Sequence, residues 1–403
     1  MERTYNVFVD NGLFVVSHYY NKKITEVTLE DIINSTEHFA KEFAKYYMCS
    51  KDSILRKIAF GLFQNSQYTQ DTSVKSEEDK YNKVKAQYDL LLNNIGNEYC
   101  PVCGNNTMSY NMDEELIKAI GKTMCPTLSS NTFFNYANNL KYLNICPVCL
   151  YLAMLSYFNV IYVNGQSYLI EAEEDLYMYR HTNNRHVDYE RDYITKKNYK
   201  KSENGMNEVS ELVLKMILDS QIFRGYINIV KVFNSTQGES YEDHILSGKD
   251  IKFIELLKDE GLLLEFKSIK TENKKIIKRN LLNQLIMGEL QKNYLYYITY
   301  KGLRNVSEEL FNLVEEEYCH MDKRKLDLIK EISPILLEKE NNIIAKLNII
   351  SKPEDFERLL LKYDIPFKSI DDFDLLCYFK EYKQVINRIK LQINILLKES
   401  EEM

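Results

Sequence analysis

Two copies of one short cysteine motif constrain this chain more than any other feature of its sequence. The tetrapeptide Cys-Pro-Val-Cys occurs at residues 100–103, where Gly104 follows it, and again at residues 146–149. Each copy is expected to form a knuckle, a tight turn that places two sulfur atoms on one side, and glycine suits the left-handed backbone of such a turn. Two knuckles supply four thiolates, enough to close a tetrahedral structural zinc site. The expected ligands are Cys100, Cys103, Cys146 and Cys149.

Other interpretations of the cysteines stay open. A thioredoxin-like redox pair is disfavoured because no strand is expected before Cys100 and because the motif is duplicated. A catalytic zinc is disfavoured because four thiolates leave no open position for water. Cysteines in a metal-free fold are a further alternative, and Cys125 is an alternative ligand. Residues 104–145 exceed what a compact ribbon needs, so we expect an insertion with a helix near residues 113–122.

The composition favours helix. The chain has 403 residues, enough for two or three domains, yet only 13 glycines and 6 prolines. We expect a mostly α fold with a small β component, a zinc-ribbon-like four-cysteine module in the middle and a C-terminal helical bundle. The expected segments are a mainly helical region at 1–97, a zinc-knuckle module with a helix and a hairpin at 98–172, a mixed α/β segment with a basic loop at 173–247, and the bundle at 248–403.

Local patterns predict individual elements. Residues 5–16 predict a short strand or a pair of turns, broken at an Asp-Asn-Gly sequence. Thr28 followed by Asp31 predicts a capped helix that runs to about residue 48. Asn-Gly at residues 164–165, between two apolar runs, predicts a β-hairpin. Residues 176–205 are polar and mixed in charge, and they predict a long exposed loop.

The last segment has the clearest helical periodicity. Apolar residues alternate steps of three and four, which predicts a seam that packs against partner helices. An intramolecular bundle is the favoured interpretation, and an intermolecular coiled coil is the alternative. The seam consists of Leu375, Phe379, Tyr382, Ile386, Ile389, Ile393 and Leu396.

No membrane span or secretory leader is expected. Residues 142–170 carry no charge, but they contain the second cysteine pair and the Asn-Gly hairpin signal, so a buried helix plus hairpin is the better interpretation. The N-terminus shows no charged leader followed by an apolar stretch. We therefore expect reduced cysteines and a cytoplasmic protein.

The sequence lacks the common catalytic motifs. It contains no Gly-x-x-x-x-Gly-Lys-Ser/Thr loop, no His-Glu-x-x-His and no Gly-x-Ser-x-Gly. Asp188 and Glu190 could serve a metal-dependent nuclease with a nearby lysine, although carboxylates in a polar loop are usually solvated. His181 and His186 could flank a ligand, but surface histidines are the favoured interpretation. We expect no catalytic residue and no enzyme.

Basic residues concentrate in one part of an acidic chain. The net charge is −7, whereas residues 267–304 carry nine Lys or Arg against two Glu. Four tyrosines lie within the stretch, and basic side chains interleaved with aromatic ones suit phosphate contacts and base stacking. A solvated helix face with buried tyrosines is the alternative. The expected nucleic-acid contacts are Lys267, Lys270, Lys274, Lys275, Lys278, Arg279 and Arg304, with Arg185, Lys196 and Lys197 in a weaker patch at 180–201.

The paired cysteine motifs, in a mostly helical chain, resemble a known family. Residues 6–16 read Asn-Val-Phe-Val-Asp-Asn-Gly-Leu-Phe-Val-Val and precede a helix opened by Leu-Glu-Asp at residues 29–31. Together these features resemble the CXXC–CXXC family of CRISPR-associated proteins, the large subunits of the type I-B (Tneap-like) Cascade interference complex. The resemblance in motifs covers residues 5–35 and 98–172.

This resemblance implies a non-catalytic role in antiviral defence. A large subunit of this kind contacts the guide RNA handle and a short DNA motif flanking the target, while base pairing reads the sequence. Its C-terminal helices lie along the opened strands, and it helps recruit a separate helicase-nuclease. The implied partners are guide RNA, target DNA, the other Cascade subunits and that helicase-nuclease. A stand-alone zinc-ribbon nucleic-acid-binding regulator is the alternative.

Overall fold

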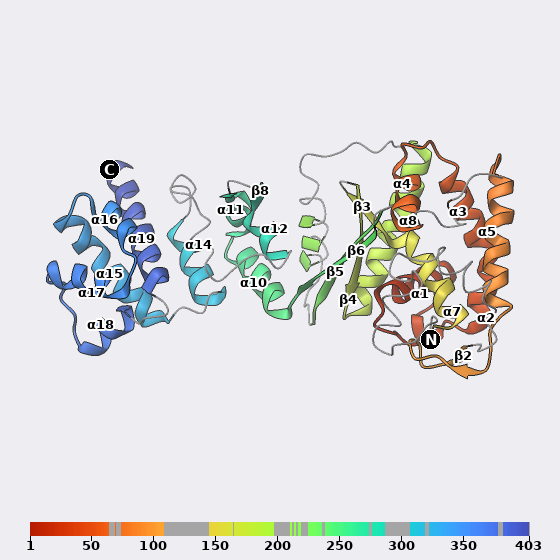
Figure 1. Ribbon diagram of the computed structural model, residues 1–403, viewed down its shortest axis with the longest axis horizontal. Coiled ribbons are helices and arrows are strands. Elements are labelled where there is room, and N and C mark those ends of the chain that lie inside the picture. The colour runs from red at the N-terminus through yellow and green to blue at the C-terminus, as the bar shows by residue number, and fades with distance from the viewer. Residues whose placement is uncertain are drawn as a thin grey trace. The chain divides into compact units, whose positions relative to one another are not determined.

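The computed structural model divides the chain into two compact units, Met1–Gly248 and Lys249–Met403 (Figure 1). The second unit begins within two residues of the expected start of the C-terminal bundle, and the three earlier segments share the first unit. The structure describes residues 1–63, 69, 74–108, 145–163, 165–196, 210–211, 213–214, 217–218, 225–235, 238–273, 276–286, 307–318, 322–377 and 382–402. The expected helix at 113–122 lies outside these residues.

The fold is mostly helical with a small β component, as the composition predicted. The described elements of the first unit are α1 (Val7–Tyr20), η1 (Ile24–Glu26), α2 (Leu29–Asn34), α3 (Thr36–Tyr47), α4 (Ile54–Phe63), α5 (Glu77–Leu92), β1 (Glu98–Tyr99), β2 (Asn106–Met108), α7 (Pro147–Leu155), η3 (Ser156–Asn159), β3 (Ile161–Val163), β4 (Gln166–Ala172), α8 (Asp175–Ile194), β5 (Ile227–Ser235) and β6 (Gly238–Leu246).

Helix α1 replaces the strand or turns predicted at residues 5–16, so that prediction was wrong. The Asn6 side chain caps the helix by accepting hydrogen bonds from the backbone N–H groups of Phe8 and Val9. The Asp-Asn-Gly sequence lies inside the helix, where Gly12 faces α7. A Cβ atom added to Gly12 would lie 1.8 Å from the carbonyl oxygen of Leu152. This glycine therefore permits close helix contact and does not mark a turn.

The capped helix predicted at Thr28 is confirmed. The Thr28 side chain accepts from the backbone N–H of Asp31, and the Asp31 carboxylate accepts from the backbone N–H of Thr28. The helix is divided at Ser35 into α2 and α3, and α3 ends at Tyr47.

A four-stranded antiparallel sheet of order β3-β4-β5-β6 lies beside these helices. The predicted Asn-Gly hairpin is confirmed: Val163 pairs with Gln166, and Gly165 has the left-handed φ of +81° that a tight turn requires. Strand β4 pairs with β5 from Ser167 to Ala172. Helices α1, α4 and α8 contact β4.

Helix α8 contradicts the long exposed loop predicted at 176–205 as far as Ile194, and residues 197–205 of that prediction lie outside the described residues. Its buried residues recur at helical spacing, but several are polar, and hydropathy alone does not reveal such a face. His181, for example, is buried, and its Nε2 lies 3.0 Å from the carbonyl oxygen of Asn159. Burial lowers the pKa of His181 to about 3, so this imidazole is neutral and donates to the carbonyl.

Buried amides connect α1 to the sheet and to η3. The Asn11 Nδ2 atom donates to the carbonyl oxygens of Val7, at 2.7 Å, and Ile170, at 3.0 Å. The Asn159 Nδ2 atom donates to Asn11 Oδ1 at 3.1 Å and to Thr182 Oγ1 at 2.9 Å. Because buried hydrogen-bonding groups are costly to leave unpaired, this network specifies how the elements meet.

The second unit consists of short helices, one hairpin and a bundle (Figure 1). Its described elements are α10 (Gly248–Asp259), α11 (Leu263–Ser268), β7 (Lys270–Asn273), β8 (Ile276–Asn280), α12 (Leu281–Ile286), α14 (Glu308–Leu313), η5, a π-helical turn (Val314–Tyr318), α15 (Lys323–Lys339), α16 (Ile343–Ile349), α17 (Pro353–Lys362), α18 (Ile370–Cys377) and α19 (Tyr382–Glu402).

The apolar seam of the last segment packs within the chain, as predicted. The core that it joins also contains buried residues of α15, α16, α17 and α18. Leu375 is partly buried against this core, and Phe379 lies outside the described residues. Four seam residues of α19 are buried in the core, Tyr382, Ile386, Ile389 and Ile393.

Among the described helices, none has the length and apolar character that crossing a membrane requires. The uncharged run at residues 142–170 instead contains α7, η3, β3 and most of β4.

The second unit also buries a carboxylic acid. Glu315, in η5, is 1% exposed, and its Oε2 atom has no hydrogen-bond partner within the described part of the chain. Burial raises the pKa of Glu315 to about 7, although the guanidinium of Arg388 favours the charged form. Glu315 is therefore a proton-binding group of the folded protein near neutral pH.

We predict that replacing Gly12 by Ala destabilises the first unit by about 3 kcal/mol, because the added Cβ would push α1 away from Leu152. Urea unfolding followed by circular dichroism measures the change. Gly165→Ala is the matched control. It strains a left-handed residue with open space around it, and should cost only about 1 kcal/mol. An equal or smaller cost for Gly12→Ala would contradict the close contact.

We also predict a pH dependence of stability that Glu315→Gln removes. Between the unfolded pKa and about pH 7, the folded chain keeps a proton on Glu315 that the unfolded chain releases. Protonated Glu315 therefore stabilises the folded chain at low pH. This contribution to the free energy of unfolding is lost as pH rises through about 7, a loss of about 3 kcal/mol. Glutamine does not titrate, so the free energy of unfolding of the variant, relative to that of wild type, should rise by about 3 kcal/mol between about pH 5 and about pH 8. A constant difference between the two proteins in urea unfolding would refute the assignment.

Candidate metal centre

The four cysteines of the two motifs come together in one cluster. The Sγ atoms of Cys100, Cys103, Cys146 and Cys149 all lie within 4.8 Å of one another. Three of the residues are buried and Cys103 is half-buried. Cys103 Sγ and Cys146 Sγ are 3.8 Å apart, far beyond the length of a disulfide bond. The cluster is thus a set of four free thiols that could bind a metal ion.

The first cysteine pair lies in the turn between β1 and β2. Gly104 has a φ of +72°, and its N–H donates to the carbonyl oxygen of Cys100 at 2.8 Å. The N–H of Cys100 donates to the carbonyl oxygen of Asn105 at 2.9 Å. These bonds form the tight turn that the sequence predicted here, with glycine at the left-handed position.

The second cysteine pair also brings its two sulfurs together, but it does so at the start of a helix and not in a hairpin turn like the first pair. Cys146 is the N-cap of α7, and its Sγ accepts from the backbone N–H of Cys149 at 3.4 Å. Pro147 follows at the first helical position, where its missing N–H costs nothing. The positive end of the helix dipole therefore faces these sulfurs and opposes the rise in their pKa that the neighbouring thiols and burial cause.

The thiols influence one another strongly. The hydrogen bond from Cys100 lowers the pKa of Cys103, whereas the hydrogen bond with Cys100 raises the pKa of Cys149. Four thiolates this close repel one another, so a bound cation is needed before all of them ionise. Such a closed set of sulfur ligands suits a structural role, since no position is left for a substrate or a water.

The cluster joins a surface hairpin to the core of the first unit. Every residue of α7 from Pro147 to Leu155 is buried, and the helix packs against α1 and α5. The alternative ligand Cys125 lies outside the described residues. A metal held between the β1–β2 hairpin and α7 would therefore hold the hairpin against the N-terminus of this buried helix.

From Lys270 to Asn280, within the described residues, the basic stretch forms a hairpin and not the helix face considered from the sequence. Lys267 lies half-buried in α11, and the chain then forms the β7–β8 hairpin. In this hairpin Lys270 pairs with Asn280, and Thr271 pairs with Arg279. Lys278 lies in β8, while Lys274, Lys275, Arg304 and the four tyrosines lie outside the described residues, as does Lys197.

Arg185 does not belong to an exposed basic loop, so that prediction was wrong. Its side chain is buried in α8, its Nη1 donates to Asp188 Oδ2 at 2.9 Å, and its guanidinium lies over the ring of Tyr189. Lys196 is exposed just beyond the end of α8. Of the predicted contacts Arg185 and Lys196, which the structure describes, Lys196 is the exposed one.

The carboxylates considered for a nuclease do not converge. Asp188 pairs with Arg185 and, at 2.8 Å, with Arg191, whereas Glu190 faces His186 at 3.8 Å. Within the described residues, the cysteine cluster is the one group of three or more potential metal ligands that lies close together.

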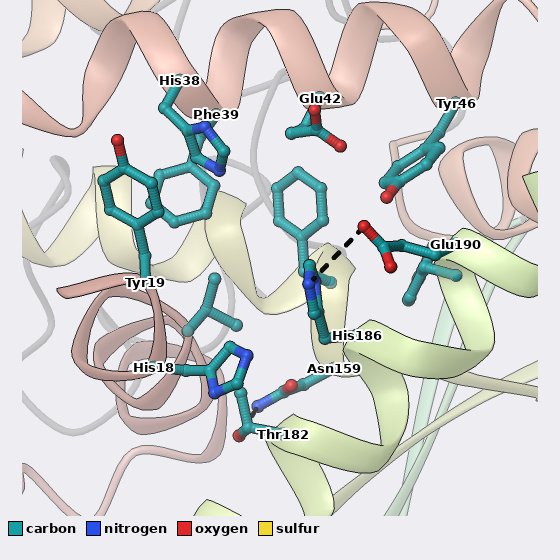
Figure 2. A pocket seen from close by; sticks show the side chains of 13 residues that line it. His18, Tyr19, His38, Phe39, Glu42, Tyr46, Asn159, Thr182, His186 and Glu190 are labelled. Carbon is teal, nitrogen blue, oxygen red and sulfur yellow. Dashed lines mark hydrogen bonds and ion pairs between the residues drawn. The ribbon is translucent and has the colours of Figure 1, made fainter. Parts of the chain in front are cut away.

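A cavity beside α8 was not predicted from the sequence (Figure 2). It brings together His18 from α1, His38 from α3 and His186 from α8. The predicted alternative of His181 and His186 flanking one ligand fails because His181 is buried. Residues this far apart in sequence carry no common motif, so no sequence signal could have grouped them.

Comparison with protein-family models, curated proteins and solved structures finds no match for this chain.

We predict that replacing both Cys100 and Cys103 by Ser abolishes metal binding and lowers the melting temperature, because two of four ligands are lost and α7 is no longer tied to the hairpin. Elemental analysis should find about one metal ion per wild-type chain and about none in the variant. Cys49→Ser is the control, since Cys49 is outside the cluster. A metal-free wild type, with the double variant equally stable, would exclude the metal centre.

Proposed function

We propose that this chain is the non-catalytic large subunit of a type I CRISPR RNA-guided interference complex. One observation carries the proposal: the two cysteine motifs that resemble the CXXC–CXXC family converge on one cluster, although they lie far apart in sequence. A mostly helical scaffold and a C-terminal helical bundle also fit that family. In this role the chain binds guide RNA and target-flanking DNA in antiviral defence.

The metal that we propose for the cysteine cluster is zinc. A closed set of four thiolates is typical of structural zinc, which is redox-inert and accepts tetrahedral geometry. An iron–sulfur cluster is the other common occupant of four thiolates, and its visible absorption would distinguish it. Zinc here supplies folding energy to the module and does not take part in a reaction.

For the nucleic-acid contact we propose the basic region around the β7–β8 hairpin. It concentrates positive charge in a chain whose net charge is −7, so electrostatic attraction to a phosphate backbone is local. Lys270, Lys278 and Arg279 lie on the hairpin strands. Catalytic motifs are not needed if the chain recognises DNA shape and recruits a separate helicase-nuclease while the guide RNA reads the sequence. The proposed complex acts in the cytoplasm with the other Cascade subunits.

The direct test is affinity purification of the tagged chain, co-expressed with its neighbouring genes, followed by sequencing of bound RNA. We expect short guide RNAs with repeat-derived handles and a repeated backbone subunit. Tag alone is the control. If the chain is recovered without RNA or partners, the Cascade proposal fails and a stand-alone zinc-ribbon regulator becomes the better interpretation.

A second prediction concerns the hairpin. In the assembled complex, the double variant Lys278→Glu and Arg279→Glu should weaken binding of target-flanking DNA by at least about tenfold and reduce the dependence of affinity on salt, because phosphate contacts are lost. The matched control makes the same charge change at exposed residues of the same unit, Lys323→Glu and Lys352→Glu. Equal DNA affinities for the two double variants in a filter-binding titration would place the contact elsewhere.

A further inference from the structure

The cavity beside α8 has the features of a ligand site, and its interpretation does not depend on the proposed function. It has a volume of about 340 Å³, within the range of small-molecule sites. Figure 2 shows His38, Glu42 and Tyr46 on α3 facing His186 and Glu190 on α8 across the cavity.

Aromatic rings form much of the cavity wall. Tyr19 and His38 are stacked, with ring centroids 4.0 Å apart and an interplanar angle of 18°. Phe39 lies against Phe158, with centroids 5.4 Å apart. The faces of aromatic rings carry negative charge density, so such walls accept apolar groups and cations alike.

The cavity offers several hydrogen-bond acceptors beside the hydroxyl and imidazole groups of its wall. Glu42 and Glu190 contribute carboxylates. Asn159 is fully buried, and its Nδ2 atom is already used by Asn11 and Thr182, whereas its Oδ1 atom has no donor within the described part of the chain. A buried acceptor without a donor is costly, and a ligand with N–H groups would relieve that cost.

The charged residues of the cavity also indicate whether it suits a cation or an anion. Burial lowers the pKa of His18, and His186 lowers it further; burial lowers the pKa of His38 as well. Both imidazoles are therefore neutral near pH 7, and Glu42 and Glu190 are the acidic residues that line the cavity. Glu42 already pairs with Lys45 at 3.4 Å and accepts a hydrogen bond from Tyr46. The His186 Nε2 atom lies 3.8 Å from Glu190, which is longer than a hydrogen bond.

We propose that this cavity binds an organic cation that carries N–H donors on an apolar body, an alkylguanidinium or an alkylammonium. Aromatic walls suit the apolar body and the charge, and the carboxylates with Asn159 Oδ1 suit the N–H donors. A phosphate or another anion would be repelled by Glu42 and Glu190. A metal ion fits less well, because these side chains do not form a close ligand group as the cysteines do.

The site should respond to pH. Acidification protonates His18 and His38, and the added positive charge opposes a bound cation. The other titratable or charged groups that bear on these imidazoles are Lys41, Glu42 and Lys45 of α3 and His186 and Glu190 of α8. Affinity should therefore fall on acidification below the ordinary pKa of histidine.

The test compares two ligands that differ in charge and not in shape. Isothermal titration calorimetry of the full chain near neutral pH should detect binding of n-butylguanidinium, and its neutral isostere n-butylurea should bind at least about tenfold more weakly. Glu190→Gln and Glu42→Gln should each weaken the guanidinium by about tenfold. Glu37→Gln is the control, because Glu37 is an exposed residue of α3 that pairs with Lys41 and does not line the cavity.

Each alternative result overturns the proposal. Equal affinity for n-butylurea would show that the cavity does not recognise charge. Unchanged guanidinium binding in both glutamine variants, with circular dichroism spectra like that of wild type, would place the ligand elsewhere. No binding at ligand concentrations up to about 10 mM would exclude the site.

Discussion

The close packing of α1 against α7 is the contact on which the first unit depends. Gly12 lets the two helices approach until the backbone of Leu152 occupies the space of a side chain. Helix α7 is buried along its whole length, and its first residues supply two of the four cysteines. Core packing therefore stabilises this helix along its flank, and a metal held by the four cysteines would stabilise the same helix at its N-terminus. A metal at the N-terminus of α7 would thus add stability to a helix on which the core of the first unit depends.

A polar network extends this core to the cavity. Asn11 joins α1 to β4, and Asn159 joins α1 to α8 through Thr182. His181 holds the carbonyl of Asn159 from the other side. Because these buried groups are held by hydrogen bonds to several elements, the cavity wall is preorganised, and the remaining acceptor of Asn159 is the feature that the fold leaves for a ligand.

The two units carry different candidate sites. The first unit carries the cysteine cluster and an acidic, aromatic cavity, whereas the second carries the basic hairpin and the helical bundle. In the role that we propose, the second unit would contact nucleic acid and a metal would stabilise the first unit, and neither task requires a catalytic centre. The acidic cavity is suited to a cationic ligand and adds a binding property that the proposed complex does not require.

Local sequence determined several features of this protein. Spacing alone identified the four cysteines, because a Cys-x-x-Cys pair positions its sulfurs through local turn geometry. The capping box at Thr28, the Asn-Gly hairpin and the seam of α19 also follow from neighbouring residues. Tertiary structure decided the rest. The sequence around Gly12 predicts a turn, and only the presence of α7 shows why glycine is needed there. Arg185 is predicted to be solvated, and only the packing of α8 into the first unit buries it. The histidine cavity joins three distant helices, and no local pattern encodes contacts that exist only after those helices pack.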